Sequence, residues 1–219
     1  MRLRPARPRP AGGFLGTAGA LLLCLVGLAP PALARVPRIL VFGDSLTAGF
    51  GLPAGEAFPA RLQARLKTLG ITARVVNAGA SGDTTADGLA RLDWALADKP
   101  DLVILELGAN DMLRGLDPRI VRDNLDAMIR TIQQSGAKVL LAGMRAVPNW
   151  GDAYQRRFDR IYPALAKARG VALYPFFLDG VALKPALNQS DGKHPNARGV
   201  AIVVDRIAPY VARMIGGKS

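Results

Sequence analysis

The 219-residue chain contains a single histidine, His194, and histidine is the side chain that acts as both base and acid near neutral pH. It stands in the run Asp191-Gly192-Lys193-His194-Pro195-Asn196, three residues after a carboxylate. That spacing allows Asp191 to bond one ring nitrogen while the other nitrogen faces a reacting group. Because a lone histidine is more often structural, the pair predicts a general base only if a nucleophile lies within its reach.

Ser45 is the candidate nucleophile, in the run Gly43-Asp44-Ser45-Leu46 directly after an apolar segment. A serine hydroxyl reacts when a base removes its proton, so Ser45 has to meet His194 in space. The Gly-X-Ser-X-Gly turn of the α/β-hydrolases is absent around it. Taken alone, a serine at this place is better explained as the cap of a helix.

The single histidine also limits metal chemistry. Zinc sites with two or three histidines are excluded, and the only cysteine, Cys24, lies in an N-terminal apolar stretch. A carboxylate-only magnesium site is conceivable, with the candidate ligands Asp44, Asp83, Asp111 and Asp191. Nothing in the sequence favours it, so we predict a site without metal or cofactor.

Residues 1–34 have the pattern of a secretory signal peptide. Four arginines precede an apolar stretch at residues 14–28, and Ala32-Leu33-Ala34 offers small residues at the −3 and −1 positions. We therefore expect cleavage after Ala34, a periplasmic or secreted location, and one domain over residues 35–219. A retained membrane anchor is the alternative, although interrupting glycines and Pro30-Pro31 make the stretch short for a membrane span.

Removal of residues 1–34 takes away four arginines and no acid, which lowers the formal net charge from +12 to +8. The other basic residues, Arg91 among them, are scattered. We interpret them as solvated helix faces, with at most weak contact to a membrane surface. Nucleic acid is not an expected partner, because the sequence has no dense basic run and no basic–aromatic alternation. The sequence contains no pattern that indicates an oligomeric state, and we expect a monomer.

Apolar runs alternate with amphipathic segments between residues 38 and 214. The expected strands are 38–42, 73–76, 102–107, 138–142 and 172–174. The expected helices are 58–69, 84–97, 118–134, 154–168 and 197–214. This alternation predicts an α/β fold, a three-layer α/β/α sandwich with a five-stranded parallel sheet.

Polar, glycine-containing loops follow the first three expected strands, at 43–49, 77–83 and 108–113, and a fourth at 191–199 leads into the last helix. Sites in open parallel sheets form beyond the carboxyl ends of the strands. The loops therefore predict a site at that edge, although Gly, Asn and Asp are common in ordinary turns.

Four blocks, in order, resemble those of the GDSL/SGNH hydrolases: 41–49 around Ser45, 77–84 around Gly82, 106–111 around Asn110, and 191–196 around His194. The resemblance spans nearly all of residues 37–212 and is closest to the thioesterase and lysophospholipase branch of the family. It implies the flavodoxin-like SGNH hydrolase fold.

The resemblance makes Ser45 the nucleophile, His194 the general base and acid, and Asp191 the group that orients His194. It implies an oxyanion hole built from the backbone N–H groups of Ser45 and Gly82 and the side-chain amide of Asn110. These roles suit the residues, because fixed neutral donors stabilise the negative charge that develops on an acyl oxygen. Asp83 and Asp111 are interpreted as loop-stabilising, and the tryptophans Trp94 and Trp150 as packing or groove-lining residues.

The resulting expectation is a serine esterase that hydrolyses carboxylic esters and thioesters through an acyl-enzyme on Ser45. Small-molecule esters, thioesters or lysophospholipids are the expected substrates. One alternative is a carbohydrate or peptidoglycan O-acetyl esterase on the same residues. The other is a non-catalytic lipid- or glycan-binding protein, but this alternative predicts loss of Ser45, Asn110 or His194, and all three are present.

Overall fold

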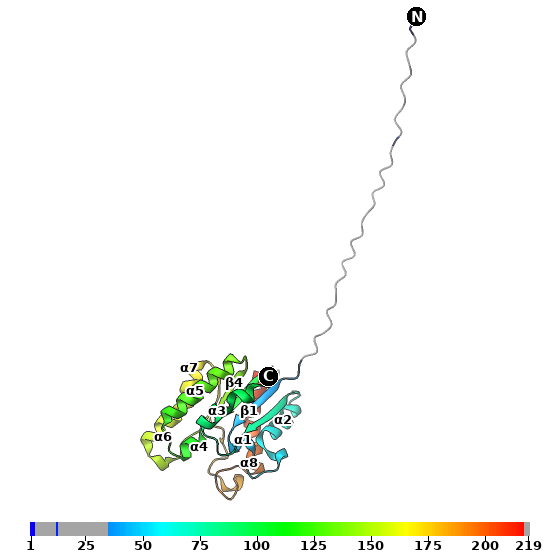
Figure 1. Ribbon diagram of the computed structural model, residues 1–219. Coiled ribbons are helices and arrows are strands. Elements are labelled where there is room, and N and C mark those ends of the chain that lie inside the picture. The colour runs from blue at the N-terminus through cyan, green and yellow to red at the C-terminus, as the bar shows by residue number, and fades with distance from the viewer. Residues whose placement is uncertain (3–11, 13–34, 217–219) are drawn as a thin grey trace. The chain divides into compact units, whose positions relative to one another are not determined.

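Five parallel strands form one sheet in the order β2-β1-β3-β4-β5 in the computed structural model (Figure 1). Their bounds are β1 Arg38–Gly43, β2 Arg74–Gly79, β3 Leu102–Glu106, β4 Lys138–Ala142 and β5 Ala172–Tyr174. The structure describes residues 1–2, 12 and 35–216. The predicted signal peptide and its cleavage site fall almost entirely outside these residues.

Helices cover both faces of the sheet, which confirms the predicted α/β/α sandwich (Figure 1). The helix pair on one face is α2 (Phe58–Thr68) and α8 (Ala197–Met214), which pack together. The other face carries α3 (Thr85–Leu96), α5 (Pro118–Gln134) and α7 (Ile161–Arg169). Strand order reverses between β1 and β3, and the crevice at such a reversal is where open sheets bind ligands.

Strand register aligns the three loops predicted to carry the site. Gly43 at the end of β1 pairs with Gly79 on β2 and with Glu106 on β3. The central strand β3 is buried along its whole length, as expected for a strand covered on both faces. The loops after β1, β2 and β3 therefore start at the same level of the sheet edge.

Amphipathic spacing explains the long helices. In α5 the buried residues recur at helical intervals, from Val121 through Leu125 and Met128 to Ile132, and Pro118 occupies the first turn. Both α5 and α8 have the bounds that the sequence predicts. None of the helices in residues 35–216 is both long and apolar enough to cross a membrane.

Two expectations about local structure are wrong. The single helix expected at 154–168 is two helices, α6 (Asp152–Asp159) and α7, because Pro163 has no N–H to bond the carbonyl of Asp159 and its ring crowds that carbonyl. The loops at 43–49 and 108–113 each contain a short helix, α1 (Ser45–Ala48) and α4 (Ala109–Leu113).

Short 3₁₀ helices occur in the remaining loops: η1 (Ala54–Glu56), η2 (Pro148–Trp150) and η3 (Pro185–Leu187). Helix α3 has a side-chain cap at its N-terminus. Thr84 is the cap: its hydroxyl accepts the Asp87 N–H, and the Asp87 carboxylate accepts the Thr84 N–H at 2.9 Å. Asp83 is thereby free to bind elsewhere.

Candidate active site

His194 joins Ser45 to Asp191 through its two ring nitrogens. Its Nε2 lies 2.9 Å from Ser45 Oγ, and its Nδ1 lies 2.6 Å from Asp191 Oδ2. Ser45 is the first residue of α1. His194 lies two residues before Asn196, whose side chain caps α8 by accepting the N–H groups of Arg198 and Gly199. Segments 149 residues apart thus meet in one hydrogen-bonded row.

Asp191 is fixed by its own turn as well as by the histidine. Its Oδ1 accepts the backbone N–H groups of Lys193 at 2.8 Å and His194 at 3.0 Å. The hydrogen bond from the His194 ring, followed by these backbone bonds, holds the pKa of Asp191 well below its usual range. The carboxylate is therefore charged at neutral pH, where it orients the ring and favours an imidazolium.

Gly43 has to be a glycine for reasons of space. A Cβ there would lie 2.2 Å from Thr47 Oγ1 and 2.4 Å from Glu106 Oε2. These two atoms are themselves hydrogen-bonded at 2.7 Å. The buried Thr47–Glu106 pair thus packs directly under the turn that carries Ser45.

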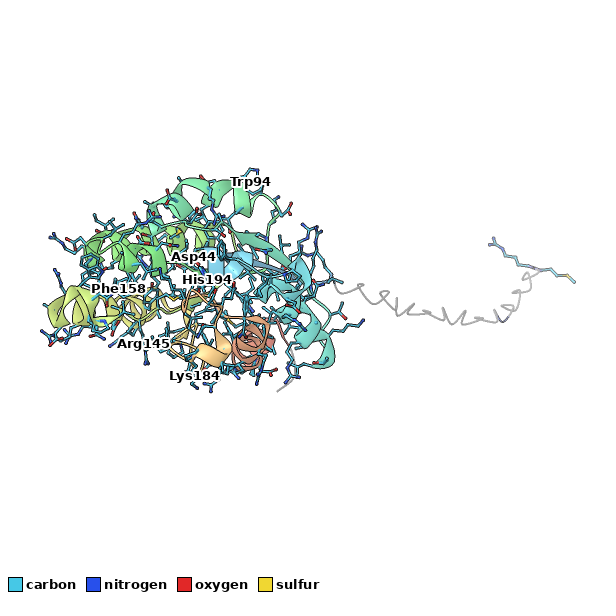
Figure 2. The ribbon with its side chains drawn as sticks, turned by 90° about the horizontal axis from the view of Figure 1, so that it is seen from below. Asp44, Trp94, Arg145, Phe158, Lys184 and His194 are labelled. Atoms are coloured by element: carbon cyan, nitrogen blue, oxygen red, sulfur yellow. The ribbon has the colours of Figure 1, made fainter. Side chains whose placement is uncertain are left out.

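Two buried carboxyl groups lie close to Ser45. Burial raises the pKa of Asp44 to about 6, and the Leu46 N–H that it accepts partly offsets this. Burial and the charge of Asp44 raise the pKa of Glu106 well above its usual value. Figure 2 shows Asp44 near His194, where a positive charge on the ring favours the ionised form of Asp44.

The residues predicted for the oxyanion hole lie around the same turn. The N–H of Ser45 is in the first turn of α1, where helical N–H groups have no intrahelical acceptor. Gly82 has a φ of 89°, which only glycine adopts readily. Asn110 Nδ2 donates to the Asp83 carbonyl at 2.9 Å and to Asp44 Oδ2 at 3.2 Å. Asn110 therefore bridges the residue after Gly82 and the residue before Ser45.

The predicted stabilising roles of Asp83 and Asp111 agree with their contacts. Asp111 accepts the backbone N–H of Thr85 at 2.8 Å and its hydroxyl at 2.6 Å, which fixes the start of α3. Asp83 accepts Arg91 Nε at 2.6 Å. Within residues 35–216, no three His, Cys, Asp or Glu side chains converge closely enough to hold a metal ion.

One aromatic side chain lies against the row of Ser45, His194 and Asp191, and a second lies beside the helix that carries Asn110. The ring of Phe50 lies 4.7 Å from that of His194, centroid to centroid, and is half-exposed. Trp150, whose role the sequence left open, donates its indole N–H to the Met112 carbonyl at 2.8 Å, and its ring lies against Gly115. It is half-exposed beside the helix that carries Asn110, whereas Trp94 is exposed on α3.

Sequence reasoning missed two residues that shape this site. Arg91 was interpreted as a solvated surface charge, but it bonds three groups around the Ser45 and Gly82 turns. Glu106 was included in an apolar strand without comment, although a carboxyl group inside that run was itself a signal. Both residues act across long sequence separations, which local patterns do not reveal.

A hydrogen-bonded row of serine, histidine and aspartate at the carboxyl edge of an open parallel sheet has the arrangement of a serine hydrolase. A sequence model of the GDSL-like Lipase/Acylhydrolase family matches residues 41–202. The chain belongs to this family, and it is a serine hydrolase of the esterase type.

Named relatives cover most of the chain. Esterase TesA of Pseudomonas aeruginosa is 44% identical over 199 residues, covering 90% of this chain and 99% of the relative. Thioesterase 1/protease 1/lysophospholipase L1 of Escherichia coli K12 is 38% identical over 187 residues, covering 85% and 88%. The crystal structure of AlinE4, an SGNH-hydrolase family esterase, is 49% identical with a TM-score of 0.70, covering 84% and 100%.

Proposed function

We propose that this protein is an exported esterase that cleaves carboxylic esters and thioesters through an acyl-enzyme on Ser45. The observation that carries the proposal is the continuous row from Asp191 through His194 to Ser45, with contacts of 2.6 and 2.9 Å. The atoms that must exchange a proton are already within hydrogen-bond reach.

In the first step, Ser45 Oγ attacks the carbonyl carbon while His194 Nε2 takes the hydroxyl proton. The charged Asp191 stabilises the resulting imidazolium and keeps its ring in place. The imidazolium then gives its proton to the leaving alcohol or thiol as the bond to the acyl carbon breaks. The acyl group is left on Ser45.

The negative oxygen of the tetrahedral intermediate is bound by the N–H groups of Ser45 and Gly82 and by the Asn110 amide. In the resting site Asn110 Nδ2 donates one hydrogen to the Asp83 carbonyl at 2.9 Å and the other to Asp44 Oδ2 at the longer distance of 3.2 Å. The oxyanion takes the hydrogen that points to Asp44. The hydrogen bond to the Asp83 carbonyl keeps the Asn110 amide pointing at the oxyanion, so the site needs little reorganisation as the charge develops.

In the second step, water attacks the acyl-enzyme while His194 takes one of its protons. The tetrahedral intermediate collapses, His194 returns that proton to Ser45 Oγ, and the carboxylic acid leaves. No metal or cofactor takes part in this sequence of steps.

Acyl esters, aryl esters, thioesters and lysophospholipids are the proposed substrate classes. The relatives named esterase and thioesterase 1/lysophospholipase L1 support this range. Half-exposed apolar side chains offer contacts for an acyl chain: Phe50 beside His194, Leu113 on the helix that carries Asn110, and Trp150 against that helix.

Export rests on the pattern of residues 1–34, which is that of a signal peptide cleaved after Ala34. The mature domain, residues 35–219, would then act in the periplasm or outside the cell. We propose that it works as a monomer, with at most weak contact to a membrane surface through its net positive charge.

The test is hydrolysis of p-nitrophenyl esters from acetyl to palmitoyl by the protein purified from cells expressing the full chain, beside the variant Ser45→Ala. We expect Ser45→Ala to lower kcat by about 10⁴-fold or more, because the nucleophile is removed. Mass spectrometry of the purified protein locates its N-terminus, which checks cleavage after Ala34.

The chain-length profile separates the remaining readings. Activity on butyryl and longer esters supports the proposal, whereas activity confined to acetyl esters supports the O-acetyl esterase. Equal activity in Ser45→Ala contradicts the mechanism. Absence of hydrolysis from both proteins contradicts the proposed substrate range and favours the binding-protein alternative.

A further inference from the structure

Arg91 on α3 makes hydrogen bonds to three different segments around the candidate site. Its Nε donates to Asp83 Oδ2 at 2.6 Å, one terminal nitrogen to the Ala78 carbonyl at 2.9 Å, and the other to the Gly43 carbonyl at 2.9 Å. Asp83 lies in the loop after β2, Ala78 on β2, and Gly43 at the end of β1. One side chain thus joins both strand ends to the loop of Gly82.

The guanidinium is well satisfied in a largely buried position. Only 25% of the Arg91 side chain is exposed, and its Asp83 partner is 17% exposed. The ring of Phe42 lies 4.1 Å from the guanidinium carbon, a cation–π contact. Only a planar fork with donors in several fixed directions can reach all three acceptors, so lysine is no substitute here.

The groups that Arg91 holds are adjacent to every proposed oxyanion donor. Gly43 lies two residues before Ser45, and its carbonyl also accepts the Ala80 N–H at 3.0 Å. Asp83 directly follows Gly82, and the Asp83 carbonyl receives the Asn110 amide. A displacement of Asp83 would therefore move two of the three donors relative to Ser45.

We propose that Arg91 is a positioning residue of the oxyanion hole, which fixes the Gly82 loop against the nucleophile turn without touching the substrate. The inference rests on the proposed esterase function. Its physical basis is that oxyanion donors stabilise a transition state only when they are held in place before charge develops. Displacements of about 1 Å cost on the order of 100-fold in rate.

The kinetic test compares Arg91→Met and Arg91→Lys with the unchanged protein, on a p-nitrophenyl ester that it hydrolyses. We expect Arg91→Met to lower kcat by about 10- to 100-fold with KM within about twofold, because binding energy away from the reacting carbonyl is retained. Arg91→Lys should recover less than a third of the loss. The matched control is Arg122→Met on the exposed face of α5, where Arg122 pairs with the adjacent Asp123.

A double-mutant cycle with Asn110→Ala tests whether Arg91 acts through the oxyanion hole. In the Asn110→Ala background, Arg91→Met should cost several-fold less than it does in the unchanged protein, because one of the two donors that Arg91 helps to hold in place is already gone. Full multiplication of the two losses would overturn the proposal, since it would mean that Arg91 acts independently of this donor.

Hydrogen–deuterium exchange supplies a readout that does not require esterase activity. In Arg91→Met, exchange over residues 78–86 should rise by about tenfold or more, while exchange over α5 stays unchanged. Unaltered exchange over 78–86, or kcat within twofold of the unchanged protein, overturns the proposal. If Arg91→Met does not fold, Asp83→Asn in the same assays replaces it, because it weakens the Nε contact alone.

The experiments distinguish a failure of the proposed function from a failure of the proposed role of Arg91. A failure of the proposed function appears as an unchanged protein without Ser45-dependent hydrolysis, whatever the exchange over residues 78–86. A failure of the Arg91 proposal appears as an active protein whose rate and loop exchange do not respond to Arg91→Met.

Discussion

The two halves of the candidate site are held in different ways. Around Ser45, the side chains of Asp44, Glu106 and Asp111 are fully buried and tie three loops to one another. On the other side, the side chain of Asp191 is 36% exposed and that of His194 is 20% exposed. The proposed oxyanion half is thus built into the protein interior, whereas the proposed acid–base half lies on a surface loop.

The loop that carries His194 is anchored mostly by its own polar side chains. Gln189 Nε2 donates to the carbonyls of Phe50 and Pro195 at 2.7 and 3.1 Å, and Asn188 Nδ2 donates to those of Val181 and Lys184 at 2.9 and 2.8 Å. The Gln189–Phe50 bond ties the loop to the segment after α1.

The difference follows from what each half has to do. Donors that stabilise an oxyanion work through preorganisation, and buried hydrogen-bond networks are rigid. A general base has to exchange protons with water and substrate, which partial exposure permits. We therefore expect changes on the loop to affect catalysis alone, and changes in the interior to affect catalysis and stability together.

Asp191→Asn is expected to separate the two halves most clearly, with a large loss of kcat and little loss of stability. Loss of the charge and of the correct ring tautomer should lower kcat by about 10³- to 10⁴-fold. The free energy of unfolding should change by less than about 1 kcal/mol, because the carboxylate is partly solvated. Steady-state kinetics and urea unfolding measure the two quantities on the same preparation.

Asp205→Asn is the matched control for that variant, since Asp205 on α8 is exposed and pairs with Arg65 on α2. It should leave kcat within twofold. A loss below tenfold in Asp191→Asn would contradict the assigned role, and a large loss of stability would erase the contrast between the two halves.

Asn110→Ala is expected to have the next largest effect, and it tests the interior half. Removal of one oxyanion donor should lower kcat by about 10²- to 10³-fold. The buried acceptors on Asp83 and Asp44 also lose their donor, which should cost about 1–2 kcal/mol of unfolding free energy. Kinetics and urea unfolding again give both numbers.

Gln133→Ala provides the amide control for Asn110→Ala, because Gln133 Nε2 donates to the Arg169 carbonyl between α5 and the end of α7. It should leave kcat unchanged. If Asn110→Ala lowers kcat without any loss of stability, the oxyanion half is less constrained than its contacts indicate.

Much of the fold could be predicted because its signals are local. Helix α5 carries its own apolar spacing and a proline in its first turn, and helix α8 carries its own Asn196 cap. The break between α6 and α7 was missed, although Pro163 marks it, because the apolar pattern continues across it. The short helices α1 and α4 have too few residues for any periodicity.

The site was predictable only where residue types are distinctive. A single histidine close to Asp191, together with Ser45 in a recognisable block, allowed the three catalytic candidates to be predicted. The supporting residues carry no such mark, because Arg91 reaches Gly43 across 48 residues and Thr47 reaches Glu106 across 59. Their functions depend on tertiary contacts, which only the structure supplies.

The last prediction concerns the pH dependence of stability and the buried acid beneath the turn that carries Ser45, through Glu106→Gln. Burial and the charge of Asp44 raise the pKa of Glu106 in the folded protein, whereas the unfolded chain releases this proton at about pH 4.3. Above that pH the folded state holds a proton that the unfolded state has lost, so folding stability falls as pH rises. The fall continues until pH reaches the raised pKa of the folded protein.

Glutamine keeps the shape and the hydrogen bond with Thr47 but does not titrate. The unfolding free energy of the Glu106→Gln variant, minus that of the unchanged protein, should therefore increase by up to about 1.4 kcal/mol per pH unit above pH 4.3. Urea unfolding at pH 5, 6 and 7 measures this slope, with Glu56→Gln, partly exposed beside Arg61, as the control. Parallel curves for the two proteins would mean that Glu106 is solvated well enough to ionise normally. The interior half of the site would then be more accessible to water than its contacts indicate. The expectation that changes there alter both kcat and stability would be weaker as a result.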